Sequence, residues 1–340
     1  MATEAFTVHG GRLAEARARF PGAPLPWIDL STGVNPLPYP AAPADVDARA
    51  RLPDPEEIGA LEAVAAGAFG VAADSVLATA GAEAAIRLLT SVLPARQVAI
   101  LEPTYGGHAE AWRAAGAAVF GVERSNRDRL IDDFDALIVT NPNNPDGAAL
   151  PVDALVDLGA GAIAKDGWLI VDEAFIEASD ADSLIPRLNS QIGADGLIVL
   201  RSFGKFYGLP GVRLGFVAAR PQIIALLRRR LGAWPVSADA IAAGRQAYAD
   251  RTWAKQTRGR LSRQTGRLDA LLERSGLRVI GGTSLFRLTE SEDAQTRFVR
   301  LAEAGVLTRP FDYAPQWLRF GLPAPEHWPR VEAALMESGR

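Results

Sequence analysis

The sequence contains no cysteine and only three histidines, His9, His108 and His327, in 340 residues. Without cysteine there is no disulfide, thiol nucleophile or thiolate metal ligand. The histidines lie too far apart for a zinc or iron ligand pattern, so we expect no metal. No stretch approaches the roughly 18 apolar residues of a membrane span, and the N-terminus lacks the apolar segment of a signal peptide. We therefore expect a cytoplasmic protein with no membrane partner.

An excess of one charge sign is also missing, because the formal net charge is only -4. This balance does not favour nucleic acid as a partner and favours a small-molecule substrate. Hydrophobic residues make up 48% of the chain and charged residues 22%, as in folded globular proteins. A chain of 340 residues exceeds what one hydrophobic core usually organises, so we expect a large domain and a smaller one.

Lysine is scarce too, since only Lys165, Lys205 and Lys255 are found among 36 basic residues. An amine that loses its proton forms an imine, which arginine does not do. Lys165 and Lys255 lie in polar surroundings where chance explains them. Lys205 instead follows Ser202 by three residues and precedes Arg213 by eight, in a glycine-rich stretch. A hydroxyl and a guanidinium at these positions suit a phosphate dianion.

Short apolar runs alternate with helical patterns from about residue 77 to residue 219. This alternation predicts an α/β fold whose large domain has a mostly parallel sheet with crossover helices. We expect strands at 97–102, 117–122, 136–140, 168–172, 197–201 and 213–218, and helices at 83–93, 107–115 and 152–164. Arginine-rich amphipathic stretches and short strands follow, which predicts a smaller α/β domain. We divide the chain into an N-terminal arm (1–40), a large domain (41–225) and a small C-terminal domain (226–340).

Polar residues follow several predicted strands, and ligands of open α/β sheets bind beyond the carboxyl ends of the strands. The strand 168–172 ends in Asp172 and Glu173. A carboxylate beside an apolar strand needs a compensating partner, which a pyridinium nitrogen would provide, although a helix cap or a surface turn explains the pair about as well. The strand 136–140 leads into Asn-Pro-Asn-Asn144-Pro-Asp-Gly, which is either an ordinary turn or the source of an amide donor to a ligand.

A third polar segment, Thr79-Ala-Gly81-Ala82-Glu83, precedes a predicted helix. The N-H groups and the dipole at the start of a helix bind phosphate well. Taken alone this signal is weak, because many helices begin after a glycine.

Four ordered motifs carry a resemblance: Asn-Pro-Asn-Asn-Pro-x-Gly, Val-Asp-Glu-Ala-Phe, Ser-Phe-x-Lys and Gly-x-Arg-x-Gly. Together they resemble the fold-type I, class I/II aminotransferase superfamily, over about residues 30 to 320. The resemblance implies a pyridoxal 5'-phosphate (PLP) cofactor and a homodimer. It implies that Lys205 carries the cofactor covalently, that Asp172 pairs with its ring nitrogen, that Tyr105 stacks on the ring and that Asn144 bonds the ring hydroxyl. The cofactor phosphate would be held by Gly81, Ala82, Glu83, Ser202 and Arg213.

The N-terminus narrows the resemblance further. His9-Gly10-Gly11 and the later Asp29-Leu-Ser-Thr-Gly33-Val-Asn35 resemble the threonine-phosphate decarboxylase family of cobalamin biosynthesis. Phe175 also favours that family, because histidinol-phosphate aminotransferases usually have tyrosine there. The implied reaction converts L-threonine-O-3-phosphate to (R)-1-amino-2-propanol phosphate. The implied residues for this amino-acid phosphate substrate are His9, Gly33, Asn35, Asn144, Arg309 and Arg319.

Two departures and three rival hypotheses stand beside this interpretation. Leu52 occupies a position where both families often have tyrosine, and the loop between Arg309 and Arg319 is short. The nearest rival is an aminotransferase of the histidinol-phosphate type. A dinucleotide-dependent oxidoreductase is suggested by the glycine pattern at 159–164, but no room remains there for a following helix, so we interpret it as a helix end. A non-catalytic descendant is the third rival, and the intact Lys205 argues against it.

Overall fold

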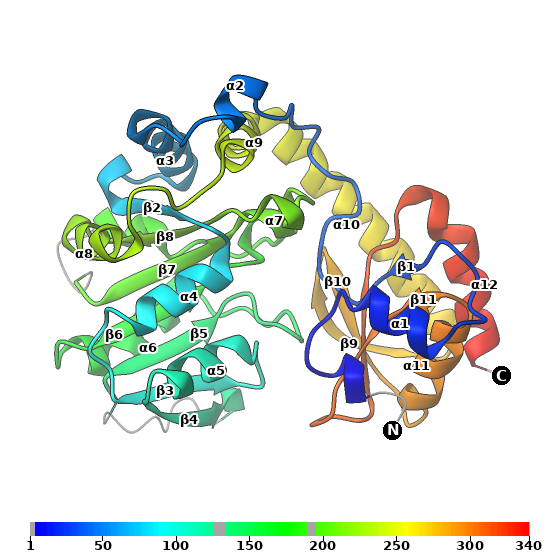
Figure 1. The fold of residues 1–340 in the computed structure, drawn as a ribbon. Coiled ribbons are helices and arrows are strands. Elements are labelled where there is room, and N and C mark those ends of the chain that lie inside the picture. The colour runs from blue at the N-terminus through cyan, green and yellow to red at the C-terminus, as the bar shows by residue number, and fades with distance from the viewer. Residues whose placement is uncertain (1–3, 126–133, 190–194, 340) are drawn as a thin grey trace. The chain divides into compact units, whose positions relative to one another are not determined.

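The computed structural model describes residues 4–125, 134–189 and 195–339. The chain forms two compact units (Figure 1). Unit 1 comprises Met1–Pro38, Pro145–Gly147 and Lys255–Arg340, and unit 2 comprises Tyr39–Asn144 and Ala148–Ala254. The boundary near residue 254 falls inside the long helix α10 (Arg251–Arg274). The division into an arm and two domains with borders at 40 and 225 stays a prediction.

Unit 2 contains a seven-stranded sheet in the order β2-β8-β7-β6-β5-β3-β4. Only β8 runs antiparallel to its neighbours, so the sheet is mostly parallel. This confirms the predicted fold class. The strands are β2 (Val76–Thr79), β3 (Gln97–Glu102), β4 (Ala118–Glu123), β5 (Ala136–Thr140), β6 (Trp168–Asp172), β7 (Leu197–Ser202) and β8 (Gly215–Ala219).

Helices cover both faces of this sheet because its central strands are apolar on both sides. Figure 1 shows α4 (Ala82–Thr90) and α5 (Gly107–Ala114) over the near face. They form a core with α8 (Pro221–Leu231) that contains Trp112 and Ile170. On the opposite face, Phe69 contacts Phe216 with ring centroids 5.7 Å apart. That face is covered by α3 (Pro55–Phe69), α6 (Val152–Ile163) and α9 (Ala238–Ala249).

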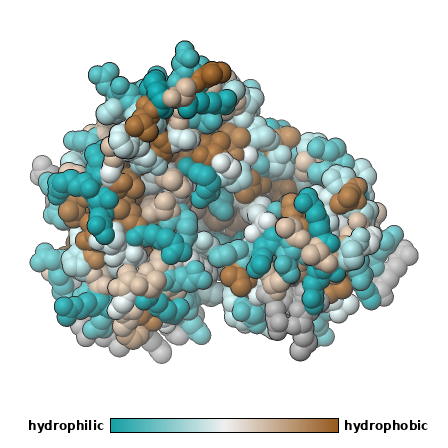
Figure 2. All heavy atoms as spheres, viewed as in Figure 1, coloured by the Kyte–Doolittle hydropathy of each residue, from teal (hydrophilic) through white to brown (hydrophobic). Residues whose placement is uncertain are grey.

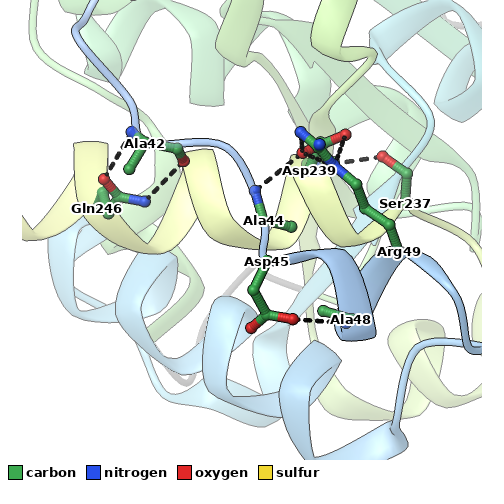
Figure 3. Close-up of polar contacts among 9 residues, drawn as sticks. Ala42, Ala44, Asp45, Ala48, Arg49, Ser237, Asp239 and Gln246 are labelled. Carbon is green, nitrogen blue, oxygen red and sulfur yellow. Dashed lines mark hydrogen bonds and ion pairs between the residues drawn. The ribbon is translucent and has the colours of Figure 1, made fainter.

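A segment before α3 is pinned to α9 (Figure 3). Ala42 exchanges two hydrogen bonds with the Gln246 amide, at 3.0 and 3.1 Å. Asp239 accepts from the Ala44 N-H at 2.9 Å and pairs with Arg49 at 2.8 Å. The short helix α2 (Val46–Arg49) is capped by Asp45. These contacts fix residues 42–49 against α9, and we call them the α2 segment.

Unit 1 contains an antiparallel sheet in the order β12-β13-β10-β9 and a parallel pair, β1-β11. The pair joins β1 (Ile28–Asp29) to β11 (Val306–Leu307), so part of the predicted N-terminal arm belongs to a sheet. The other strands are β9 (Arg278–Thr283), β10 (Phe286–Glu290), β12 (Arg309–Pro310) and β13 (Trp317–Gly321). The helices are α1 (Leu13–Arg19), the larger part of α10, α11 (Ala294–Glu303) and α12 (Trp328–Ser338).

Candidate active site

The carboxyl ends of β2, β3, β5, β6 and β7 lie at one edge of the unit 2 sheet, where the antiparallel β8 begins. The strand register aligns the residues at this edge. Gly215 is paired with Thr79 on one side and Ser202 on the other, and Thr140 is paired with Asp172. The structure thus brings the predicted cofactor residues of unit 2 to one edge: Gly81, Ala82, Glu83, Tyr105, Asn144, Asp172, Ser202, Lys205 and Arg213.

Asp172 is held in place by two donors. Its Oδ1 accepts from the Ala174 N-H at 3.0 Å, and its Oδ2 lies 3.0 Å from His108 Nε2. Both side chains of the His108–Asp172 pair are buried, with exposures of 1% and 5%. Sequence analysis missed His108. The available signal was its helical spacing from Trp112, which places it on the buried face of α5.

Glu173 makes a different set of contacts from its neighbour Asp172. Its carboxylate pairs with the buried Arg201 at 3.1 Å and accepts from Ser183 at 2.7 Å and the Leu184 N-H at 2.6 Å. Arg201 also pairs with Glu177 at 2.8 Å. Burial raises the pKa of Glu173, against the lowering effect of Arg201. Glu173 therefore stabilises the fold through Arg201, Ser183 and Leu184, and these partners differ from those of Asp172.

The asparagine loop after β5 is fixed by its own side chains. Asn141 donates to the Leu150 carbonyl at 3.1 Å and accepts from the Leu150 N-H at 2.7 Å. Asn143 accepts from the Thr104 hydroxyl at 2.8 Å and donates to the Pro103 carbonyl at 2.9 Å. These bonds hold the loop, and Asn144 is half-buried at its end.

The start of α4 forms a cradle suited to an anion. Gly81 has a left-handed φ of 92° and no side chain caps the helix. A Cβ on Gly81 would lie 2.7 Å from Arg213 Nη2, so glycine is required for the guanidinium to approach the helix start. A Cβ on Gly215 would lie 2.5 Å from the Ala82 nitrogen. Backbone N-H groups, the helix dipole and a guanidinium therefore converge, which fits a phosphate group.

Lys205 lies on the short helix α7 (Phe203–Phe206), which directly follows β7. Phe203 and Phe206 are buried on either side of it, and Lys205 Nζ lies 5.5 Å from the Phe175 ring centroid. Tyr105, at the end of β3, donates a hydrogen bond from its hydroxyl to Glu83 Oε2 at 3.0 Å. Burial and the Glu83 carboxylate raise the pKa of Tyr105, so its hydroxyl stays protonated.

Unit 1 contains a second group of predicted residues, led by Arg309 and Arg319. The two are directly paired across β12 and β13, and we call them the arginine pair. Arg319 is buried and donates to the Ser31 carbonyl at 2.7 Å, while Arg309 donates to the Val8 carbonyl at 2.8 Å. Burial and the adjacent Arg309 lower the pKa of Arg319 to about 9. Two like charges placed opposite each other are unfavourable, so an anion would stabilise them.

The predicted N-terminal residues gather near Ser31. A Cβ on Gly10 would lie 2.4 Å from the Ser31 carbonyl oxygen, and the Gly11 N-H donates to the Ser31 hydroxyl at 2.8 Å. The close approach at Gly10 and the positive φ of 80° at Gly11 explain why two glycines follow His9, which is exposed beside Val8. The predicted residues Gly33 and Asn35 are buried, and the Asn35 side chain accepts from the Leu37 N-H at 3.0 Å.

Comparison with known proteins agrees with this arrangement. The family model for "Aminotransferase class I and II" matches residues 26–328. The chain belongs to the class I and II aminotransferase family.

Two relatives of this family member are named threonine-phosphate decarboxylase. The Sinorhizobium sp. protein is 44% identical over 93% of each chain. The Pseudomonas aeruginosa protein is 39% identical over 96% of this chain and 97% of its own. Among solved structures, histidinol-phosphate aminotransferase from Clostridium acetobutylicum covers 92% of this chain and 99% of its own, with a TM-score of 0.81 and 20% identity. That structural likeness confirms the aminotransferase fold.

The structure also bears on the other function classes. The glycines at 159 and 161 lie inside α6 near its end, as expected, and Gly159 packs against the Leu169 side chain of β6. The residues between α6 and β6 leave no crossover helix after this pattern, so the dinucleotide fingerprint is not formed. Within residues 4–125, 134–189 and 195–339, no group of three potential metal ligands was found, and no helix is long and apolar enough to cross a membrane.

Proposed function

We propose that this aminotransferase family member is a PLP-dependent decarboxylase of L-threonine-O-3-phosphate. The observation that carries this proposal is the arginine pair, two arginines placed directly opposite each other across β12 and β13. Such a site suits a substrate that is more anionic than an ordinary amino acid. The relatives named threonine-phosphate decarboxylase, at 44% and 39% identity over nearly the whole chain, support the same substrate.

The unit 2 edge fits PLP in the types of its side chains. Lys205 would be the amine that carries the cofactor, and the cradle at Gly81 and Arg213, together with Ser202, would hold its phosphate. Asp172 pairs with the ring nitrogen, and its bonds from His108 and Ala174 keep the carboxylate in one orientation. Tyr105 would stack on the ring, and Asn144 would bond the ring hydroxyl. An ionised Asp172 favours a protonated ring nitrogen.

The protein residues divide the reaction between them. When bound, PLP supplies the electron sink for charge that develops at the substrate α-carbon. The bond from the α-carbon to the carboxylate breaks, carbon dioxide leaves, and Lys205 delivers a proton to the α-carbon in its place. His9, Arg309 and Arg319 would bind anionic groups of the substrate, and their binding energy would orient the carboxylate for departure.

We further propose a homodimer, as the family resemblance implies. Val46 of the α2 segment is 77% exposed, and Leu52 beyond it is 62% exposed. Figure 2 shows apolar atoms on the surface over α2 and α3 of unit 2. Because the α2 segment is pinned to α9, it presents these side chains on a fixed support. Val46→Glu with Leu52→Glu should shift sedimentation toward the monomer, and an unchanged sedimentation coefficient would contradict this surface.

The proposed activity is tested by incubating the PLP-loaded protein with L-threonine-O-3-phosphate. We expect equimolar carbon dioxide and 1-amino-2-propanol phosphate, with threonine a poor substrate. Lys205→Ala is the negative control, because it leaves the anion sites of both units intact. Conversion of histidinol phosphate with 2-oxoglutarate, without carbon dioxide from phosphothreonine, would instead establish the aminotransferase alternative. Absence of turnover with both substrates would favour a ligand-binding descendant.

A further inference from the structure

The loop between β12 and β13 carries a tyrosine to which sequence analysis gave no function. This residue, Tyr313, lies on the loop that joins Arg309 to Arg319, the two members of the arginine pair. The residue as a whole is 54% exposed, although it is large and aromatic. An exposed tyrosine next to two cations calls for a physical reason beyond packing.

The ring of Tyr313 is held by aromatic neighbours on the same element pair. Its centroid lies 5.4 Å from that of Phe311 and 6.2 Å from that of Trp317. The Arg309 guanidinium lies over the same Phe311 ring, at 5.5 Å from the centroid. Phe311 is buried in a small core with Leu288 and Ala314. One fixed ring therefore supports both the Arg309 guanidinium and the Tyr313 ring.

The hydroxyl of Tyr313 lies in the electrostatic field of both members of the arginine pair. Burial of the hydroxyl raises the pKa of Tyr313 to about 12, against the lowering effect of Arg309 and Arg319 and with a smaller raising effect of the Asp312 and Asp146 carboxylates. The group is therefore protonated at any working pH and is a hydrogen-bond donor to an anion. None of the ring contacts uses the hydroxyl, so the packing of Tyr313 does not depend on it.

We propose that the Tyr313 hydroxyl is the third donor of the anion site formed by the arginine pair and selects a phosphate over a carboxylate. A phosphate monoester has three terminal oxygens and a charge of about -1.5 to -2, whereas a carboxylate has two oxygens and one charge. Two guanidinium groups satisfy the two oxygens of a carboxylate. Only the phosphate has a further oxygen for the hydroxyl. This inference rests on the proposed function, because it assigns the phosphate of that substrate to the arginine pair.

The test compares Tyr313→Phe with the wild-type protein, both loaded with PLP. The variant keeps the ring contacts and removes one hydrogen bond to a charged group, so KM for L-threonine-O-3-phosphate should rise about tenfold with kcat within twofold. The inhibition constant of inorganic phosphate should rise by a similar factor, and kcat/KM for threonine should stay within twofold. Ser262→Ala, which removes an exposed hydroxyl from α10 in the same unit, is the matched control and should leave all these values unchanged.

The outcomes separate this inference from the proposed function. If the wild-type protein releases carbon dioxide from phosphothreonine and Tyr313→Phe has the same KM, the function stands and the role of Tyr313 is wrong. Equal losses for phosphothreonine and threonine would also overturn phosphate selection. If the wild-type protein does not release carbon dioxide, the proposed function fails. Calorimetric titration of both proteins with inorganic phosphate then tests the role of Tyr313 independently. An unchanged affinity in Tyr313→Phe would refute its role as a donor.

Discussion

Asp172 and Glu173, at the end of β6, allow a direct test of which carboxylate serves catalysis and which serves stability. Asp172→Asn keeps the shape of the side chain and its acceptor for the Ala174 N-H. Its new amide N-H donates to His108 Nε2 once the imidazole carries its proton on Nδ1, so we expect the free energy of unfolding to change by less than about 1 kcal/mol. The substitution removes the charge proposed to pair with the cofactor ring nitrogen. Electrostatic groups of this kind contribute about 100-fold or more to kcat, and we expect a loss of that size.

Glu173→Gln should have the opposite effect. It removes one partner from a buried ion pair in which Arg201 and Glu173 have side-chain exposures of 6% and 0%. Breaking a buried pair costs about 3 to 5 kcal/mol, and because Arg201 keeps its pair with Glu177 at 2.8 Å we expect the lower figure, about 3 kcal/mol. At roughly 2 to 4 °C per kcal/mol for a chain of this class, the melting temperature should fall by about 6 to 12 °C.

The assay is thermal unfolding followed by circular dichroism, together with kcat normalised to bound cofactor at 20 °C. Glu173→Gln should lower the melting temperature and leave the normalised kcat within a few fold. Asp172→Asn should do the reverse. If Glu173→Gln instead reduces kcat as severely as Asp172→Asn while melting at the wild-type temperature, our separation of the two carboxylates is refuted.

Three further predictions concern the cofactor residues of unit 2. Borohydride reduction and peptide mapping should place the phosphopyridoxyl group on Lys205, and its recovery on Lys165 or Lys255 would overturn the assignment. Gly81→Ala should weaken PLP binding about tenfold or more in a fluorescence titration, because the new Cβ would push the Arg213 guanidinium away from the helix start and strain a backbone with a φ of 92°. Gly22→Ala, with no atom within 4 Å of its Cβ, should bind PLP normally. Phe175→Tyr introduces a hydroxyl near Lys205 that favours the ionised ring oxygen of the cofactor. The pKa of the linkage between Lys205 and PLP, read from the visible spectrum, should therefore fall. An unchanged or raised pKa would contradict that reasoning.

Local patterns were sufficient for the central strands and their flanking helices. β5 and β6 have the predicted bounds, because uninterrupted apolar runs bounded by turn residues identify buried parallel strands. The edge strand β2 was not predicted. Its four residues carry no period, and it pairs with β8, which lies far along the chain.

Long-range contacts were the part that residue patterns did not reveal. His108 and Asp172 lie 64 positions apart, and the sequence around each residue does not predict a hydrogen bond between them. Similarly, sequence analysis took Asp172 and Glu173 as a pair. The alternation of side chains along a strand separates them, since successive residues point to opposite sides of the sheet.

From sequence alone follow the α/β fold, the single well-placed lysine and the set of motifs at the strand ends, because these depend on local periodicity and on residue chemistry. The tertiary structure decided the partners of these residues. It paired Glu173 with Arg201 and Asp172 with His108, and it placed Arg309 directly opposite Arg319. Strand register and helix packing determine such neighbours, and both result from the burial of surfaces contributed by distant parts of the chain, which no local pattern encodes.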